Sequence, residues 1–141
     1  MTRAVALDIG TRRIGVALSD SNGTVATPYE VVQRSGDRGR DHRRIHALVD
    51  EAGAEVVVVG LPFSLDGSVG PAARAILEEV DQLRATLPVE VVTWDERLTT
   101  VEAERSLRVM GVKKGNRRRV VDQVAATVIL QSWLDAGQPR G

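Results

Sequence analysis

Residues 4–18 of the chain read AVALDIGTRRIGVAL, and this stretch decides the fold. Its first half is an apolar run interrupted only by Asp8, and a Gly-Thr-Arg-Arg turn then leads into a second, alternating run. Asn22 and Gly23 come next, a pair that is typical of a hairpin when it stands between two extended runs. Residues 24–32 form the third run. The pattern therefore predicts three antiparallel strands at the start of the chain.

The remainder of the chain alternates between helical and extended patterns. Continuous β-branched residues over 55–59 are typical of a strand buried on both faces, and Thr99 and Glu102 are spaced as a capping box at a helix start. The expected helices span 40–52, 71–85, 99–110 and 120–136, and the later strands span 55–59 and 89–94. These elements predict a single α/β domain over residues 1–141, with a mixed five-stranded sheet covered by helices on both faces.

The composition limits the classes of function. The chain has 141 residues and carries 19 Lys and Arg against 19 Asp and Glu, so any nucleic acid must be bound through local clusters of charge. Cysteine is absent, which excludes disulfides, thiolate metal sites and cysteine nucleophiles. The sequence shows neither a leader nor an apolar run of membrane-spanning length. We therefore expect a cytoplasmic protein with no membrane partner.

Asp8 stands out because it lies in an otherwise apolar strand that should be central to the sheet. A lone carboxylate buried there would cost several kcal/mol or would stay protonated. A cationic partner would compensate the charge, and Arg12, Arg13 or Arg97 could supply it. A metal ion would do so equally well, so the residues around Asp8 leave both explanations open.

Further carboxylates are expected near the same edge of the sheet. Asp95 and Glu96 follow the last strand, where ligands of such sheets gather, and Asp122 lies near the start of the final helix. Each has a simple structural explanation when taken alone, but convergent carboxylates repel one another unless a hard cation lies among them. Oxygen ligands without cysteine or a well-placed histidine favour Mg²⁺ or Mn²⁺. His42 and His46 have helical i, i+4 spacing, but we expect them to be exposed on a surface helix.

Basic residues cluster immediately before Asp122. A loop over 111–119 carries five of them, and a cationic loop beside a metal site could hold the phosphates of a nucleic acid: Lys113, Lys114, Arg117, Arg118 and Arg119. Arg12 and Arg13 could reach a phosphate near Asp8 or pair with an acid. A second basic region over 34–44 is diluted by acidic residues, and we expect it to be a mobile loop before the first helix.

Four motifs together resemble one family. They are DIGTRRIGVA at 8–17, GLP at 60–62 with DG at 66–67, DERLTT at 95–100 and DQVAA at 122–126, and they look like the YqgF/RuvX family. The resemblance implies an RNase H-like fold and a catalytic acidic triad at Asp8, Glu96 and Asp122, with Asp95 as a further candidate ligand. It also implies a nuclease that uses Mg²⁺ or Mn²⁺, with two ions expected. The activities attached to the family are 5′-end maturation of pre-16S rRNA, in ribosome biogenesis, and Holliday junction resolution.

Two other classes of function stay open at this point. A non-catalytic RNA-binding module could use the basic loop alone. The motif Asp8-x-Gly10-Thr11 also resembles the phosphate-binding strand of actin and sugar-kinase phosphotransferases, although those proteins need two such domains around a nucleotide. The sequence does not decide between RNA and branched DNA as substrate. It also does not decide between a monomer and a homodimer, and a resolvase that cuts opposed strands would need the two-fold symmetry of the dimer.

Overall fold

A five-stranded sheet forms the centre of the protein. The computed structural model describes residues 3–99 and 117–140, except for the side chains of 117–123. The strands lie in the order β3-β2-β1-β4-β5, so the strand that carries Asp8 is the middle one. Their bounds are β1 Ala4–Ile9, β2 Arg13–Ser19, β3 Ala26–Gln33, β4 Val56–Leu61 and β5 Glu90–Asp95.

The pairing directions confirm the predicted mixed sheet. β1 pairs antiparallel with β2, in a register that places Asp8 opposite Gly15, and β2 pairs antiparallel with β3. β4 pairs parallel with β1 on its other side, and β5 pairs parallel with β4. Since parallel neighbours need crossover connections, a helix must lie between β4 and β5, as the alternating sequence pattern predicted. The carboxyl ends of β1, β4 and β5 therefore meet at one edge.

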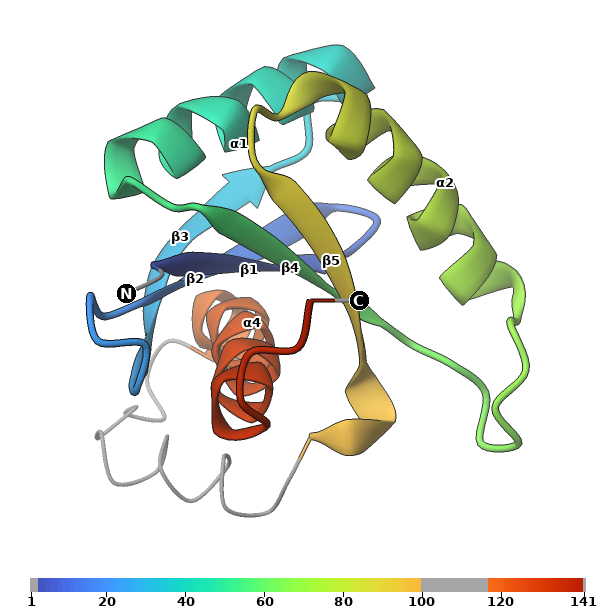
Figure 1. The fold of residues 1–141 in the computed structure, drawn as a ribbon. Coiled ribbons are helices and arrows are strands. Elements are labelled where there is room, and N and C mark those ends of the chain that lie inside the picture. Colours follow the sequence, from blue (N-terminus) through green and yellow to red (C-terminus); the bar gives the residue numbers. More distant parts are fainter. Residues whose placement is uncertain (1–2, 100–116, 141) are drawn as a thin grey trace.

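Helices cover both faces of the sheet, as expected (Figure 1). α1 (Arg38–Ala52) and α2 (Pro71–Thr86) pack on one face, and α4 (Arg117–Asp135) packs on the other. A short 3₁₀ helix, η1 (Glu96–Leu98), follows β5 directly. Within the described part of the chain, no helix is long and apolar enough to cross a membrane.

The alternation of β1 assigns its side chains to the two cores. Val5, Leu7 and Ile9 belong to the core beneath α1 and α2. Ala4 and Ala6 belong to the core beneath α4. Because successive side chains of a strand point to opposite faces, Asp8 lies on the α4 side.

Several predicted boundaries were wrong for local reasons. α1 begins at Arg38, two residues before the predicted start, because the Asp37 carboxylate caps it by accepting from the Arg40 amide. α4 begins at Arg117, so Arg117, Arg118 and Arg119 lie in a helix and not in a loop. Apart from Thr99, which follows η1, the predicted helix over 99–110 and Lys113 and Lys114 beyond it lie outside the described residues.

The Asn22-Gly23 turn also differs from expectation. Residues 20–25 form a longer loop in which the Asp20 carboxylate accepts from the amides of Thr24 and Val25. These hydrogen bonds lower the pKa of Asp20.

Candidate functional site

The carboxyl edge shared by β1, β4 and β5 brings together residues that are distant in sequence. Asp8 lies near the end of β1, Gly60 near the end of β4, and Glu96 directly after β5. Val56 and Val58 of β4 pack in the α4 core, so strand alternation assigns Gly60 to the α4 side as well. Asp8 and Gly60 thus share one face at one edge.

Glu96 lies over Gly60. A Cβ atom added at position 60 would lie 2.8 Å from Glu96 Oε1 and 2.5 Å from Ile129 Cδ1 of α4. Any side chain at position 60 would therefore displace the carboxylate, the isoleucine or both. Burial raises the pKa of Glu96, and the negative charges of Asp8 and Asp95 raise it further. Electrostatic repulsion of this kind is what a bound cation would relieve.

Asp95 is engaged differently from Glu96. Its carboxylate accepts two hydrogen bonds from the Arg97 side chain, with Nε 3.0 Å from Oδ1 and Nη2 2.6 Å from Oδ2. It also accepts a hydrogen bond from the Arg97 amide. The hydrogen bonds from the Arg97 side chain lower the pKa of Asp95, although burial opposes them. Arg97, which the sequence offered as a partner for Asp8, thus forms an ion pair with Asp95.

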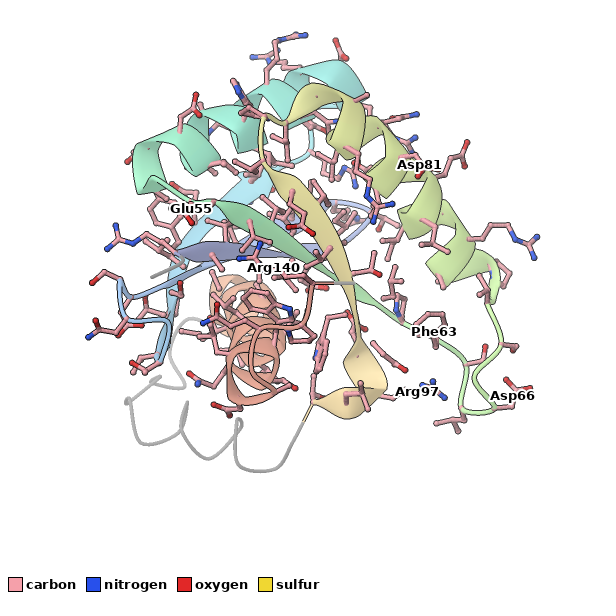
Figure 2. All side chains as sticks on the ribbon, viewed as in Figure 1. Glu55, Phe63, Asp66, Asp81, Arg97 and Arg140 are labelled. Carbon is pink, nitrogen blue, oxygen red and sulfur yellow. The ribbon has the colours of Figure 1, made fainter. Side chains whose placement is uncertain are left out.

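Arg97 also connects this edge to the loop between β4 and α2. Its guanidinium lies 5.5 Å from the centre of the Phe63 ring, an arrangement typical of a cation–π contact. Figure 2 shows Arg97 near Phe63, with Asp66 farther out in the same loop. The negative charge of Asp66 contributes to raising the pKa of Arg97, after the larger effect of Asp95.

Asp122 lies in the second turn of α4, and its side chain lies outside the described part of the structure. Among the side chains that are described, no three carboxylate or histidine groups come close enough together to hold a metal ion. A three-carboxylate site at this edge would therefore need a ligand beyond Asp8 and Glu96.

The histidines do not contribute to this edge. His42 was expected to be exposed, but only 3% of it is accessible, and its Nε2 lies 2.8 Å from Glu79 Oε2. His46 lies with Nε2 3.7 Å from Asp50 Oδ2 of the same helix. The expectation for His42 was wrong because Glu79, on α2, provides a buried partner. The donors available around Glu96 are therefore oxygens, which fit Mg²⁺ or Mn²⁺ better than zinc.

The second basic region is ordered around Arg34. Its guanidinium donates to the Gly10 carbonyl at 2.9 Å and to Glu79 Oε2 at 2.6 Å, and its Nε lies 3.5 Å from Asp41 Oδ2. The expectation of a mobile loop over 34–44 was therefore wrong. Arg34 is held by three partners, and the segment from Arg38 onward is helical.

Sequence reasoning missed Glu79. A charged residue between Ile76 and Val80 is expected on the solvent-exposed face of α2, yet only 3% of the surface of Glu79 is accessible. The signal that could have found it is its position, four residues before the buried Leu83 on the same helix face.

Arg12 lies in the turn after β1, and Arg13 begins β2 beside this network. Arg12 is exposed in the turn after β1, and its carbonyl accepts from the Arg34 amide. Gly10 makes the turn tight, because its amide donates to the Arg13 carbonyl at 2.9 Å and an added Cβ would lie 2.7 Å from that oxygen. The turn therefore carries one exposed guanidinium next to the strand of Asp8.

Comparison with known proteins gives related matches over almost the whole chain. The RuvX family model, described as Holliday junction resolvase, matches residues 2–136. A protein of Desulforudis audaxviator that carries the name "Putative pre-16S rRNA nuclease" is 48% identical over 134 residues, which are 95% of this chain and 94% of that protein. A protein of Mycolicibacterium paratuberculosis with the same name is 51% identical, covering 94% of this chain and 80% of that protein.

Solved structures show the same fold at low sequence identity. Thermus thermophilus RuvC is 17% identical, with a TM-score of 0.63 and 98% of both chains covered. The same protein in complex with Holliday junction substrate is matched at a TM-score of 0.58, with 19% identity and 99% of both chains covered. The fold is thus RNase H-like, and the sheet is mixed with its first three strands antiparallel, as the sequence predicted. From the family model and the close relatives, we conclude that this chain belongs to the RuvX family.

Proposed function

We propose that the chain is a divalent-metal-dependent endonuclease that hydrolyses phosphodiester bonds of structured nucleic acid, with Asp8, Glu96 and Asp122 as its catalytic carboxylates. The observation that carries the proposal is the position of Glu96. It lies over a glycine that leaves it room, and burial and the charge of Asp8 raise its pKa. A carboxylate in such surroundings favours a cation beside it.

The assignment of Asp122 rests on helical spacing. Ala126 and Ile129 of α4 are buried in the core beneath that helix, and position 122 precedes them by four and seven residues. These spacings belong to one stripe of a helix. Since Ile129 lies against Gly60, the stripe runs beside the edge that carries Asp8 and Glu96. We therefore infer that Asp122 is the third ligand.

In this mechanism the carboxylates bind the metal and the basic residues bind the phosphates. Asp8, Glu96 and Asp122 would hold Mg²⁺ or Mn²⁺, and a pair of such ions would supply Lewis acidity at the scissile phosphate and at the leaving oxygen. The Asp95–Arg97 ion pair keeps Asp95 out of the ligand set in the conformation observed. We assign seven cationic side chains to the neighbouring phosphates: Arg12, Arg13, Lys113, Lys114, Arg117, Arg118 and Arg119.

The similar proteins suggest two candidate substrates. The names of the closely similar proteins support pre-16S rRNA, and the family description together with the RuvC complex supports branched DNA. Both are structured nucleic acids, which proteins with few aromatic residues can recognise through phosphates and shape. We place 5′-end processing of pre-16S rRNA first, because the relatives that carry this name are 48% and 51% identical to the chain.

The test offers the purified protein a precursor 16S rRNA fragment and a four-way DNA junction side by side, with Mg²⁺ or Mn²⁺. We expect defined products from at least one substrate, none after chelation, and none with Asp8→Asn or Glu96→Gln, while both variants keep their fold and still bind. Normal metal-dependent turnover by folded Asp8→Asn would remove the mechanism. Salt-sensitive RNA binding without any cleavage, indifferent to chelator and to Glu96→Gln, would instead identify a non-catalytic binding module.

A further inference from the structure

A pocket of about 860 Å³ lies on the opposite side of the sheet from Glu96, between the turn after β1 and the helices α1 and α2. We call it the α1–α2 pocket. Ile9 lines it and faces the α1–α2 core, whereas its neighbour Asp8 faces α4. The pocket and the candidate catalytic edge are thus separated only by the end of β1 and its turn.

The wall of the pocket is partly apolar. Ile9, Pro62 and Ile76 line it, and the latter two are only partly buried, so an apolar surface faces the cavity. Small-ligand sites have volumes of roughly 300–1,000 Å³ and combine such surfaces with a few placed polar groups. The volume and the wall together suit a flat, partly apolar ligand such as a nucleobase.

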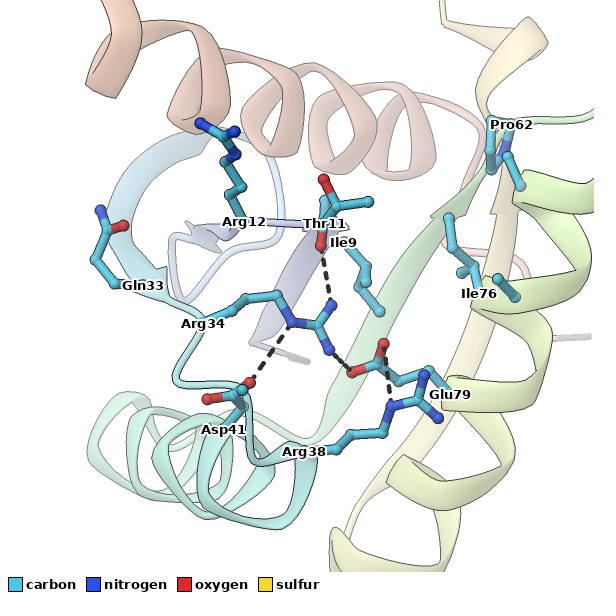
Figure 3. A pocket seen from close by; sticks show the side chains of 14 residues that line it. Ile9, Thr11, Arg12, Gln33, Arg34, Arg38, Asp41, Pro62, Ile76 and Glu79 are labelled. Atoms are coloured by element: carbon cyan, nitrogen blue, oxygen red, sulfur yellow. Dashed lines mark hydrogen bonds and ion pairs between the residues drawn. The ribbon is translucent and has the colours of Figure 1, made fainter.

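Two guanidinium groups stand at the rim. Figure 3 shows Arg38 extending from the start of α1 toward Glu79, and Arg12 extending from the turn after β1 away from Arg34 and Glu79. Arg12 is exposed, and its side chain forms no hydrogen bond or ion pair with the described residues of 3–99 and 117–140. Arg38 is 43% exposed at its side chain, with Nε 3.9 Å from Glu79 Oε1. Both groups can therefore accept an anionic ligand.

Arg34 and Arg38 together balance the two carboxylates of the pocket, Asp41 and Glu79. Arg34 crosses the middle between Asp41 and Glu79, and Glu79 Oε2 also lies 2.8 Å from His42 (Figure 3). The acids therefore do not leave an unbalanced negative charge facing the cavity. The lining therefore carries one excess positive charge, that of Arg12, while the Arg38 side chain is 43% exposed.

We propose that the α1–α2 pocket binds one nucleotide of a nucleic-acid strand that passes over the turn after β1. The base packs against Ile9, Pro62 and Ile76, and the phosphates on its two sides contact Arg12 and Arg38. The inference rests on the proposed function for the identity of the polymer. It adds a second site of contact, so that a strand cleaved at the Asp8 edge is also held at a flanking nucleotide on the other face.

The test uses NMR titration of the full chain with adenosine 3′,5′-bisphosphate, in chelator and without divalent ions. This probe carries one base and a phosphate on each side. We expect saturable shifts of the amides of Ile9, Thr11, Arg12, Gly36 and Ile76. Adenosine 5′-monophosphate should bind about tenfold more weakly, and adenosine about tenfold more weakly again, because each phosphate loses a charge-assisted contact.

Matched variants separate the pocket from general attraction to basic protein. Arg38→Gln should weaken binding about tenfold, while Arg43→Gln, an exposed arginine of the same helix outside the pocket, should not. Ala75→Phe places a ring at an exposed position in the pocket wall and should block the probe, while Ala47→Phe on the exposed face of α1 should not.

Absence of saturable shifts at the pocket, or equal binding by Arg38→Gln and Arg43→Gln, would overturn the proposal. The titration involves neither metal nor cleavage, so such a result would leave the nuclease proposal standing. Conversely, an inactive protein that still binds the probe in this pocket would count against the nuclease mechanism alone.

Discussion

Gly60→Ala is the substitution that tests the candidate catalytic edge most sharply. It adds one methyl group at a position where nothing of the chemistry is removed. The added carbon would lie 2.5 Å from Ile129 Cδ1, 2.8 Å from Glu96 Oε1 and 3.1 Å from Glu96 Cγ. Carbon atoms pack at about 3.5–4.0 Å, so the contact with Ile129 is about 1 Å too short.

The two neighbours can respond to different extents. Ile129 is 2% exposed and packed in the α4 core, so it cannot move away freely, and overpacking of this kind costs about 1–2 kcal/mol of stability. Glu96 is partly exposed and can swing outward. A displacement of about 1 Å at a positioned catalytic group can lower a rate by about 100-fold. We therefore expect a modest loss of stability and a much larger loss of cleavage.

Urea unfolding and single-turnover cleavage measure the two effects separately. The double variant Gly60→Ala with Ile129→Val removes the Cδ1 atom, so it should recover part of the stability while cleavage stays low. Ile129→Val alone should cost about 0.5–1.5 kcal/mol and keep its activity. Gly39→Ala, in the exposed first turn of α1, is the control for adding a methyl group to glycine, and it should leave cleavage unchanged.

Recovery of cleavage together with stability in the double variant would refute the reasoning, because it would mean that only the core packing matters. Full activity of Gly60→Ala itself would show that Glu96 does not act from its position over Gly60.

Three further variants test the charges. Glu96→Gln should raise the free energy of unfolding at neutral pH, because the Glu96 carboxylate is destabilised in the folded protein. The gain should be less than about 1 kcal/mol, since a partly exposed charge is screened. It should vanish below about pH 4, where a carboxyl with a raised pKa is protonated in both the folded and the unfolded protein. Arg34→Gln should cost about 3 kcal/mol in urea unfolding, because it leaves the Glu79 carboxylate, only 4% exposed, without its strongest partner, and wild-type stability would contradict this. Burial raises the pKa of Asp41, but hydrogen bonds from Ser35 and the charge of Arg34 outweigh this effect and lower the pKa. Asp41→Asn should therefore be less stable than wild type at neutral pH. The difference should disappear as the pH falls below 3.8, the ordinary pKa of an aspartate. A pH-independent difference would exclude this linkage.

The sheet could be predicted because its signals are local. The apolar run around Asp8, the β-branched run before Gly60 and the glycine after α1 each specify an element from neighbouring residues. The central position of β1 followed from these elements and from the rule that helix–strand units add parallel strands. The helix starts were less predictable, because the Asp37 cap of α1 stands among glycines and arginines that are typical of a loop.

The buried charges could not be predicted for a different reason. Glu79, His42 and Arg34 are each polar residues that are typical of a solvated surface, and only tertiary contact makes their burial favourable. The partner of Asp95 is only two residues away in the sequence. The sequence nevertheless offered three arginines as candidate ion-pair partners for the carboxylates of this edge. Geometry was needed to pair Arg97 with Asp95.

Paramagnetic broadening by Mn²⁺ would test most directly whether the carboxylates of this edge share a cation. In an NMR titration of the wild-type chain, trace Mn²⁺ should broaden the amides around Asp8, Gly60 and Glu96 first, and the broadening should weaken strongly in Asp8→Asn, in Glu96→Gln and in Asp122→Asn. Asp81→Asn, on the exposed side of α2, should leave it unchanged. Broadening that begins elsewhere on the surface, or that survives all three substitutions, would contradict the account.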